Sequence, residues 1–292
     1  MKKNAFYAQS GGVTSVINAT AGALILESKK YKSKIDKVLA GKNGILGALR
    51  EDLIDTSKES LSSIKNLRNT PGGVFGSCRF KLKSLADNKR EYQRLIEVFK
   101  AHNIGYFFYN GGNDSADTAY KVSQISDEMG YPINCIAIPK TVDNDLAVTD
   151  CCPGFGSAAK YIATSTLEAS LDVASMSETS TKVFILEVMG RHAGWMAVAS
   201  ALARSSKGDA PHIILFPEIV FNEDKFLSKV KQIVRKNGYC VIVTSEGVKN
   251  KDGHFLAESD LKDAFGHSQL GGVAPYLASL ISKKLSLKNH WA

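Results

Sequence analysis

The middle of the chain reads Ile133-Asn134-Cys135-Ile136-Ala137-Ile138-Pro139-Lys140-Thr141-Val142-Asp143-Asn144-Asp145, an apolar segment followed at once by a polar one. The apolar part is short, contains β-branched residues and ends at a proline, which predicts a buried strand rather than a helix. The polar part is then a loop at the carboxyl end of that strand. Because ligands bind at this edge of open α/β sheets, its lysine, hydroxyl and two carboxylates indicate a functional site. A polar turn held by Asp and Asn side chains is the alternative interpretation.

The same order of strand, glycine-containing or charged loop, and helix recurs in both halves of the chain. Strands are predicted at 4–8, 38–40, 105–109, 133–138, 182–188, 212–216 and 239–244, with a weaker edge element at 53–56. Helices are predicted at 14–27, 92–100 and 161–171. This alternation predicts an α/β fold with two doubly wound, Rossmann-like lobes that face a central cleft.

The composition is that of a soluble globular protein, because 44% of the 292 residues are hydrophobic and 23% are charged. The formal net charge of +8 indicates an anionic partner, either nucleic acid or a phosphorylated small molecule. Five lysines between positions 29 and 37 lie at a predicted helix end and in the loop after it, which is typical of a solvated surface. We therefore do not predict a nucleic-acid partner.

The five cysteines are odd in number and show no CxxC or Cys/His ligand spacing, so the sequence predicts reduced thiols of a cytoplasmic protein. The chain begins with Met1-Lys2-Lys3, but the apolar run that follows ends by Gln9 and is too short for a signal peptide. No apolar run approaches about 20 residues, so we predict neither a membrane span nor a membrane partner.

Three glycine-containing loops are candidate phosphate sites. Gly11-Gly12 precedes a predicted helix, where backbone N–H groups can bind an anion, although an ordinary tight turn fits equally well. The loop from Thr70 ends at Arg79, which can grip a phosphate with two parallel hydrogen bonds. A third loop, at 110–115, follows a predicted strand and leads into a helix.

Residues Thr141-Val142-Asp143-Asn144-Asp145 resemble the catalytic loop of the phosphofructokinases that use ATP or pyrophosphate. Further motifs match that family in its order and together cover nearly the whole chain: Gly11-Gly12, Gly72-Gly73 through Arg79, Gly111-Gly112-Asn113-Asp114-Ser115, Met189-Gly190-Arg191, Pro217-Glu218 and Ser245-Glu246-Gly247. The resemblance implies transfer of a phosphoryl group to the 1-hydroxyl of fructose 6-phosphate, with Asp143 as the base that accepts the hydroxyl proton.

The resemblance also assigns the other site residues. The implied catalytic residues are Asp143, Thr141, Asp145, Lys140 and Arg191. The implied diphosphate site is Gly11, Arg79, Lys140 and Asp114. The implied sugar-phosphate site is Thr141, Val142, Asp143, Lys182, Met189, Gly190, Arg191 and Glu246. Of these, Lys182 stands where many relatives have an arginine that reaches the sugar phosphate of a neighbouring subunit.

Two positions indicate the phosphoryl donor. Members of the family that use ATP carry glycine where this chain has Asp114 and Lys140, and the chain here resembles the pyrophosphate-dependent branch. A carboxylate at 114 would stand where a nucleotide phosphate has to lie, and two like charges about 4 Å apart repel by about 4 kcal/mol at an effective dielectric near 20. Lys140 would stabilise the leaving phosphate. The alternatives are an ATP-dependent enzyme of the family and a member that binds phosphates without turnover.

The resemblance further implies Mg²⁺ and a homo-oligomer, either a dimer or a tetramer. Asn113 occupies the place of a metal-coordinating aspartate in ATP-using members, so the metal would depend more on the diphosphate itself. We expect residues 1–139 with 253–292 to form the diphosphate lobe and 140–252 the fructose-phosphate lobe. Relatives of this branch continue past the position of Ala292, and we expect a sugar-phosphate element with Tyr and Arg to belong there.

Overall fold

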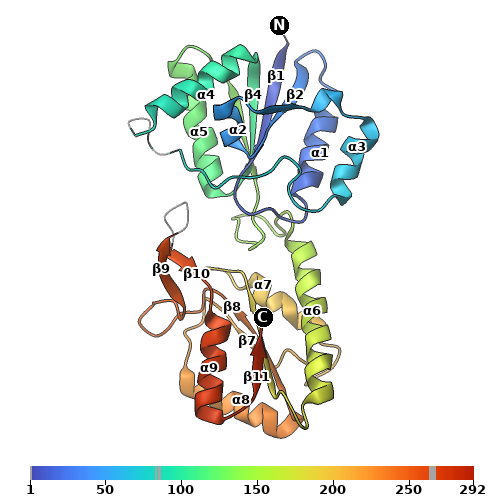
Figure 1. Cartoon of the computed structure of the whole chain (residues 1–292), viewed down its shortest axis with the longest axis vertical. Helices are drawn as coiled ribbons and strands as arrows, with labels where there is room; N and C mark the ends of the chain where they lie inside the picture. Colours follow the sequence, from blue (N-terminus) through green and yellow to red (C-terminus); the bar gives the residue numbers. More distant parts are fainter. Residues whose placement is uncertain (1, 83, 85–86, 263–267) are drawn as a thin grey trace. The chain divides into compact units, whose positions relative to one another are not determined.

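The computed structural model describes residues 2–82, 84, 87–262 and 268–292. The chain divides into two compact units, Met1–Thr141 and Val142–Ala292. Each unit is built around its own parallel or mostly parallel sheet, with helices on both faces (Figure 1). The predicted α/β class with doubly wound units is therefore confirmed.

The sheet of the first unit has the strand order β3-β2-β1-β4-β5. All neighbours are parallel except β3, which runs antiparallel to β2 at one edge. The bounds are β1 Lys3–Gln9, β2 Ile35–Gly41, β3 Leu53–Asp55, β4 Ile104–Gly111 and β5 Asn134–Pro139. After β1 the chain builds first to one side and then, from β4, to the other. The carboxyl ends of β1 and β4 are thus a topological switch point, where open α/β sheets bind ligands.

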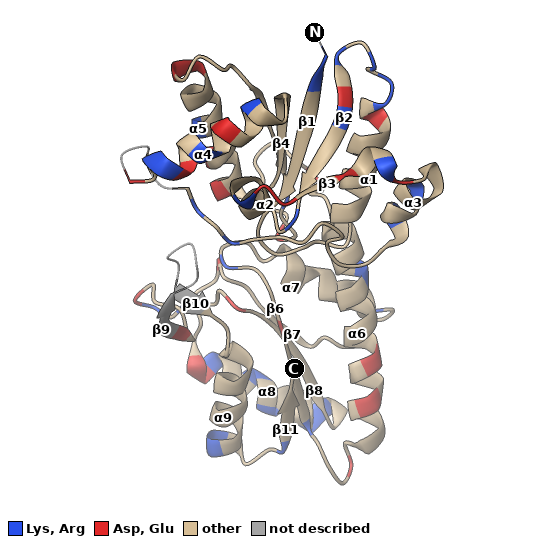
Figure 2. Ribbon diagram, turned by 45° about the horizontal axis from the view of Figure 1, so that its top comes forward, with Lys and Arg blue, Asp and Glu red and all other residues tan. Residues whose placement is uncertain are grey.

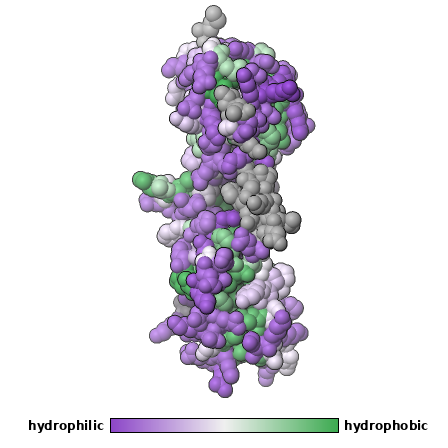
Figure 3. Space-filling model, turned by 90° about the vertical axis from the view of Figure 1, so that its left-hand side faces the viewer, coloured by the Kyte–Doolittle hydropathy of each residue, from purple (hydrophilic) through white to green (hydrophobic). Residues whose placement is uncertain are grey.

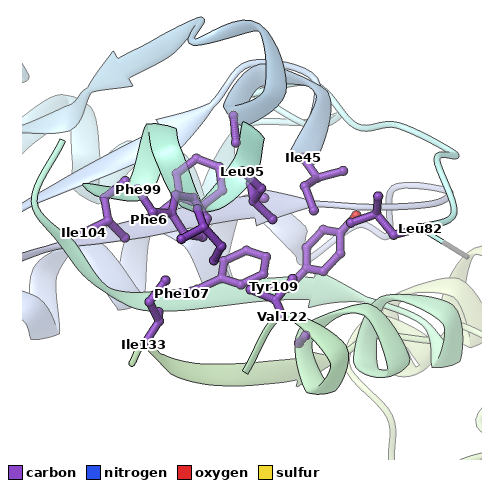
Figure 4. Packing of buried hydrophobic residues seen from close by; sticks show 14 of the residues in the cluster. Phe6, Ile45, Leu82, Leu95, Phe99, Ile104, Phe107, Tyr109, Val122 and Ile133 are labelled. Carbon is purple, nitrogen blue, oxygen red and sulfur yellow. The ribbon is translucent and has the colours of Figure 1, made fainter. Parts of the chain in front are cut away.

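Helices cover both faces of this sheet, and their apolar sides pack on it to form one hydrophobic core on each face. One core joins Phe6, Phe107 and Tyr109 of the sheet to α2 (Ile45–Arg50), α4 (Lys89–Ala101) and α5 (Asn113–Glu128) (Figure 4). The other joins Ala5 and Tyr7 to α1 (Ile17–Ser28) and α3 (Leu61–Asn66). Short 3-10 turns at Thr56–Lys58 and Leu67–Asn69 complete the second side.

Helix α4 shows why these segments become helices. Its buried residues Tyr92, Leu95, Ile96 and Phe99 recur at spacings of three and four, which puts them on one face of a helix. The remaining positions are mostly charged. The side of the first unit that carries α4 and α5 has a largely hydrophilic surface (Figure 3).

The sheet of the second unit is fully parallel, in the order β11-β6-β8-β7. Its strands are β6 Val183–Val188, β7 Ile213–Leu215, β8 Cys240–Ser245 and β11 Asn289–Trp291. Helices α8 (Glu223–Asn237) and α9 (Val273–Leu285) fill one core with Val183 and Ile185, and α6 (Phe155–Met176) and α7 (Trp195–Ala199) fill another with Val188 and Val243. A 3-10 turn, Ser200–Ala203, and an antiparallel pair, β9 Glu258–Lys262 and β10 Ser268–Leu270, complete the unit.

The expected grouping of 253–292 with the first lobe is wrong in this structure. Helix α9 buries Val273, Leu277 and Ile281 in the core that contains Val183, and β11 pairs with β6 from Asn289 to Trp291. Hydrophobic burial and a shared sheet ladder therefore hold these elements in the second unit. The first unit runs to Thr141 rather than to residue 139.

Strand β5 occurs where the sequence predicts it, but its side chains are not buried. It lies at the edge of the sheet, and among the described residues β4 is its only strand neighbour. Ile136 is 40% exposed, and of the residues from Asn134 to Pro139 none is fully buried. A short apolar run signals a strand but does not distinguish a central strand from an edge strand, because that depends on which other strands pair with it.

The lysines between positions 29 and 37 lie at the end of α1, in the following loop and in β2 (Figure 2). Two of them have acidic partners, since Lys30 Nζ lies 2.7 Å from Glu27 and Lys37 Nζ lies 2.7 Å from Asp55. This fits the predicted solvated surface. Among the described residues, no helix combines the length and apolar character needed to cross a membrane.

The environment of His212, just before β7, predicts that the free energy of unfolding depends on pH. Its Nδ1 accepts a hydrogen bond from the Val241 backbone N–H at 2.9 Å. Burial, and then the nearby Arg204, lower the pKa of the imidazole below its usual 6.5, with Asp209 acting in the opposite direction. Below pH 6.5 the unfolded chain therefore takes up a proton before the folded chain does, so the free energy of unfolding falls as the pH drops and levels off below the folded pKa.

We expect His212→Asn to reduce this dependence, because its amide oxygen can accept the same hydrogen bond and does not titrate. Denaturant unfolding at pH 7.5 and pH 5.5 would measure the difference, with replacement of the exposed His254 by Asn as the matched control. An equal loss of stability on acidification in the parent and in His212→Asn would contradict the assignment.

Candidate active site

In the first unit, the loop ending at Arg79 lies along the glycine turn after β1. Ser10 pairs with Cys78 in an isolated parallel bridge. The Gly11 N–H donates to the Cys78 carbonyl at 2.9 Å, and the Ser77 hydroxyl donates to the Gly11 carbonyl at 2.6 Å. The structure thus places Arg79 beside the turn at the switch point of the sheet.

Lys140 joins the same place from the end of β5. Its ammonium donates to the Gly12 carbonyl, and its backbone N–H donates to the Gly111 carbonyl at 3.0 Å. Gly11 has φ +76°, and a Cβ built there would be 3.2 Å from Lys140 Nζ. A side chain at position 11 would therefore be strained and would crowd the lysine. The loops after β1, β4 and β5 converge, as their position at one sheet edge predicts.

Asn113 and Asp114 form the first turn of α5, after the N-cap residue Gly112. The unsatisfied N–H groups of a helix start favour the Asp114 carboxylate there. Lys81 Nζ lies 2.7 Å from Asp114 Oδ1, in an ion pair that sequence analysis did not predict. Its signal was available: Lys81 comes two residues after Arg79, and alternate residues of an extended segment share one side.

In the second unit, the loop after Thr141 is anchored before and within its acidic part, at Val142 and at Asn144. Val142 packs against the cluster that contains Val188 and Ile162. Asn144 adopts a left-handed conformation, φ +59°, which Asn tolerates better than most residues. Its side chain accepts the Cys152 N–H at 2.7 Å and donates to the Asp150 carbonyl at 3.2 Å. Asn144 thereby fixes the backbone between Asp143, which is half-buried, and Asp145, which is exposed.

The loops after β6 and β8 also meet. The Gly190 N–H donates to Glu246 Oε1 at 3.3 Å, the Ser245 hydroxyl donates to the Gly190 carbonyl, and the Glu246 N–H donates to the Val188 carbonyl at 3.0 Å. Gly190 has φ +134°, and a Cβ there would lie 2.5 Å from the Ala193 carbonyl oxygen. Only glycine fits this turn without strain. Met189, Gly190, Arg191 and Glu246 are thus brought together.

His192, which follows Arg191, is close enough to the acidic loop for the charge of Asp145 to affect its pKa. Burial lowers the pKa of His192, and Lys249 and Arg191 lower it further, whereas the charge of Asp145 raises it. The two loops are therefore electrostatic neighbours within the second unit. The lowered pKa favours the uncharged imidazole, so Arg191 and Lys249 are the positively charged side chains that act on His192.

Lys182 does not join the other predicted sugar-phosphate residues. It precedes β6, whereas Met189 and Gly190 follow it, so the length of the strand separates them. The Lys182 ammonium donates to the carbonyls of Ser177 and Glu178 at the end of α6. Within this chain it stabilises a helix end.

The described residues of the donor site offer few metal ligands. Within residues 2–82, 84, 87–262 and 268–292, no group of three or more His, Cys, Asp or Glu is arranged to hold a metal ion. Asn113 supplies one amide oxygen, and the neighbouring Asp114 is paired with Lys81. This set fits an ion such as Mg²⁺ that takes few protein ligands and is held mainly by the oxygens of a bound phosphate compound.

Glycine turns beside basic side chains, at the switch point of a doubly wound sheet, are typical of α/β proteins that bind phosphorylated ligands. The chain belongs to the phosphofructokinase family, whose model matches residues 4–292. The family expected from the sequence motifs is therefore confirmed.

Relatives with high identity carry the same enzyme name. The pyrophosphate–fructose 6-phosphate 1-phosphotransferase of Halomonas elongata is 63% identical over 289 residues, covering 99% of this chain and 69% of the relative. The enzyme of that name from Methylococcus capsulatus is 60% identical, with the same shares covered. The crystal structure of a pyrophosphate-dependent phosphofructokinase from Marinobacter aquaeolei matches with a TM-score of 0.85 and 62% identity, covering 99% of this chain and 67% of that one.

Proposed function

We propose that the protein moves a phosphoryl group from diphosphate to the 1-hydroxyl of D-fructose 6-phosphate, giving fructose 1,6-bisphosphate and phosphate. The observation that carries the proposal is the convergence of Gly11, Arg79 and Lys140 on one sheet edge, with the Asp114 carboxylate in the first turn of the helix that begins after β4. The names of the relatives with 63% and 60% identity agree with it. The reaction is reversible in this proposal, because breaking the phosphoanhydride bond of diphosphate while a phosphate ester forms leaves little net driving force.

The first unit binds the donor in this proposal. The Gly11 turn and the Arg79 guanidinium hold the diphosphate, and Lys140 neutralises the charge that develops on the leaving phosphate. Asp114 excludes a nucleotide, since its carboxylate repels a further phosphate group. Asn113 would help to hold Mg²⁺, which when bound reduces the charge on the diphosphate oxygens.

The second unit binds the acceptor. Met189, Gly190 and Arg191 hold the sugar phosphate, and Glu246 accepts hydrogen bonds from sugar hydroxyls. Asp143 takes the proton of the attacking 1-hydroxyl, while Thr141, Val142 and Asp145 shape the loop around it. The half-buried position of Asp143 and the anchored backbone of Asn144 support this role, because a base must be held in one geometry to act.

The enzyme is a cytoplasmic homo-oligomer in this proposal. Lys182 lies apart from the remaining sugar-phosphate residues of its own chain and would serve a neighbouring subunit, as the arginine at its position does in related proteins. Neither nucleic acid nor a membrane is a partner.

A coupled assay of the purified protein with diphosphate or ATP tests the proposal. We expect fructose 1,6-bisphosphate to form with diphosphate, and kcat/KM for ATP to be lower by at least about 100-fold, given a repulsion of several kcal/mol. Comparable turnover with ATP would instead support the ATP-dependent alternative. Diphosphate binding without turnover would support a member that binds phosphates but is not an enzyme.

A further inference from the structure

The segment from Arg79 to Leu82 places a second basic side chain at the donor site. Leu82 is fully buried in the core of the first unit, near Tyr109 (Figure 4). Phe80 is partly buried and packs against the same core. Because side chains of an extended segment alternate, Arg79 and Lys81 share the opposite side. The anchoring of Phe80 and Leu82 therefore directs Lys81 away from the core and toward α5.

Lys81 meets Asp114 there, with Nζ 2.7 Å from Oδ1, and the side chains are 38% and 27% exposed. The carboxylate thus has two positive neighbours, the start of α5 and the Lys81 ammonium. Among the residues that the structure describes, Arg79, Lys81 and Lys140 are basic side chains of the donor site, and Asp114 is its carboxylate. The carboxylate occupies the position beside Lys81 that an anion would otherwise take.

We propose that Lys81 is a specificity-determining residue for the phosphoryl donor. Its effect depends on whether its ammonium pairs with the Asp114 carboxylate or with a phosphate group of the donor. In this chain Lys81 pairs with Asp114. The ion pair holds the Asp114 carboxylate in place and reduces its repulsion of the bound diphosphate. A donor with one more phosphate than diphosphate has to displace the carboxylate. When residue 114 has no carboxylate, Lys81 pairs with that extra phosphate. This inference rests on the proposed function for its choice of ligands.

The test uses the full chain with Lys81→Met, Asp114→Gly and the double variant, and measures ATP and diphosphate binding by calorimetry beside steady-state kinetics. We expect Asp114→Gly to bind ATP. The double variant Lys81→Met/Asp114→Gly should bind ATP at least about tenfold more weakly than Asp114→Gly, since one charge-assisted contact is lost. Lys81→Met alone should raise the diphosphate KM several-fold and leave kcat within a few-fold, with Lys81→Arg restoring the KM.

Lys37→Met is the matched control, because Lys37 and Asp55 form another 2.7 Å ion pair in the same unit with similar exposure, 36% and 18%. It should leave all binding constants unchanged. Equal ATP affinity in Asp114→Gly and the double variant, or no ATP binding by Asp114→Gly, overturns the proposal. Absence of diphosphate turnover in the unmodified protein would refute the proposed function, whereas the ATP-binding comparison tests Lys81 regardless of turnover.

Discussion

Replacing Asp143 by Asn is expected to lower kcat by about 10²- to 10⁴-fold, the usual contribution of a general base, and to leave the affinity for fructose 6-phosphate within a few-fold. The amide has nearly the same shape and cannot accept the hydroxyl proton. The loop itself should stay in place, because Val142 remains packed in the hydrophobic cluster and Asn144 keeps its bonds to Cys152 and Asp150.

Steady-state kinetics in both directions would measure the effect, and thermal unfolding would show that the variant is folded. Asp172→Asn is the matched control, since it removes an exposed carboxylate from α6 of the same unit and should keep full activity. Asp143→Asn with a normal kcat would remove Asp143 from the mechanism. A large loss of melting temperature in Asp143→Asn alone would indicate a structural role instead.

The double variant Asp114→Gly/Lys140→Gly is expected to reverse the donor preference. Removing Asp114 abolishes a repulsion of at most about 4 kcal/mol, the value for unscreened like charges at 4 Å and effective dielectric 20, or nearly a thousandfold in affinity. The ion pair with Lys81 reduces this repulsion, so the gain in ATP affinity is expected to be smaller than that limit. Removing Lys140 takes away the cation nearest the Gly11–Gly12 turn, so diphosphate turnover should fall by at least about tenfold. ATP turnover should become measurable.

Kinetics with both donors on the parent, the two single variants and the double variant would separate the contributions. Asp114→Gly alone should gain ATP binding, and Lys140→Gly alone should lose diphosphate turnover without gaining ATP binding. Tight ATP binding by the unmodified protein in calorimetry would show that the Asp114 carboxylate does not exclude nucleotides.

The strand positions and the family could be predicted from the sequence because both are recorded locally. Apolar runs such as 183–188 and 240–245 followed by glycine or charge specify a strand and a loop at its carboxyl end, and parallel strands bring such loops to one edge. The convergence of Gly11, Arg79 and Lys140 follows from this rule together with the motifs. The motif order likewise identified the phosphofructokinase family, which the family match over 4–292 confirms.

Only the tertiary structure shows the features that depend on contacts between distant segments: the edge position of β5, the unit to which residues 273–291 belong, and the ion pair of Lys81 with Asp114. An apolar run such as that of β5 occurs in central and in edge strands, and the structure places it at the edge, beside β4, with its side chains at least partly exposed. Residues 273–291 belong to the second unit because α9 packs against the hydrophobic residues of β6 and β11 pairs with β6 in the sheet. The pairing of Lys81 with Asp114 joins residues 33 positions apart. The alternation along the chain puts Lys81 on the same side as Arg79 but does not identify its partner, because the contact depends on the packing of Leu82 and the placement of α5.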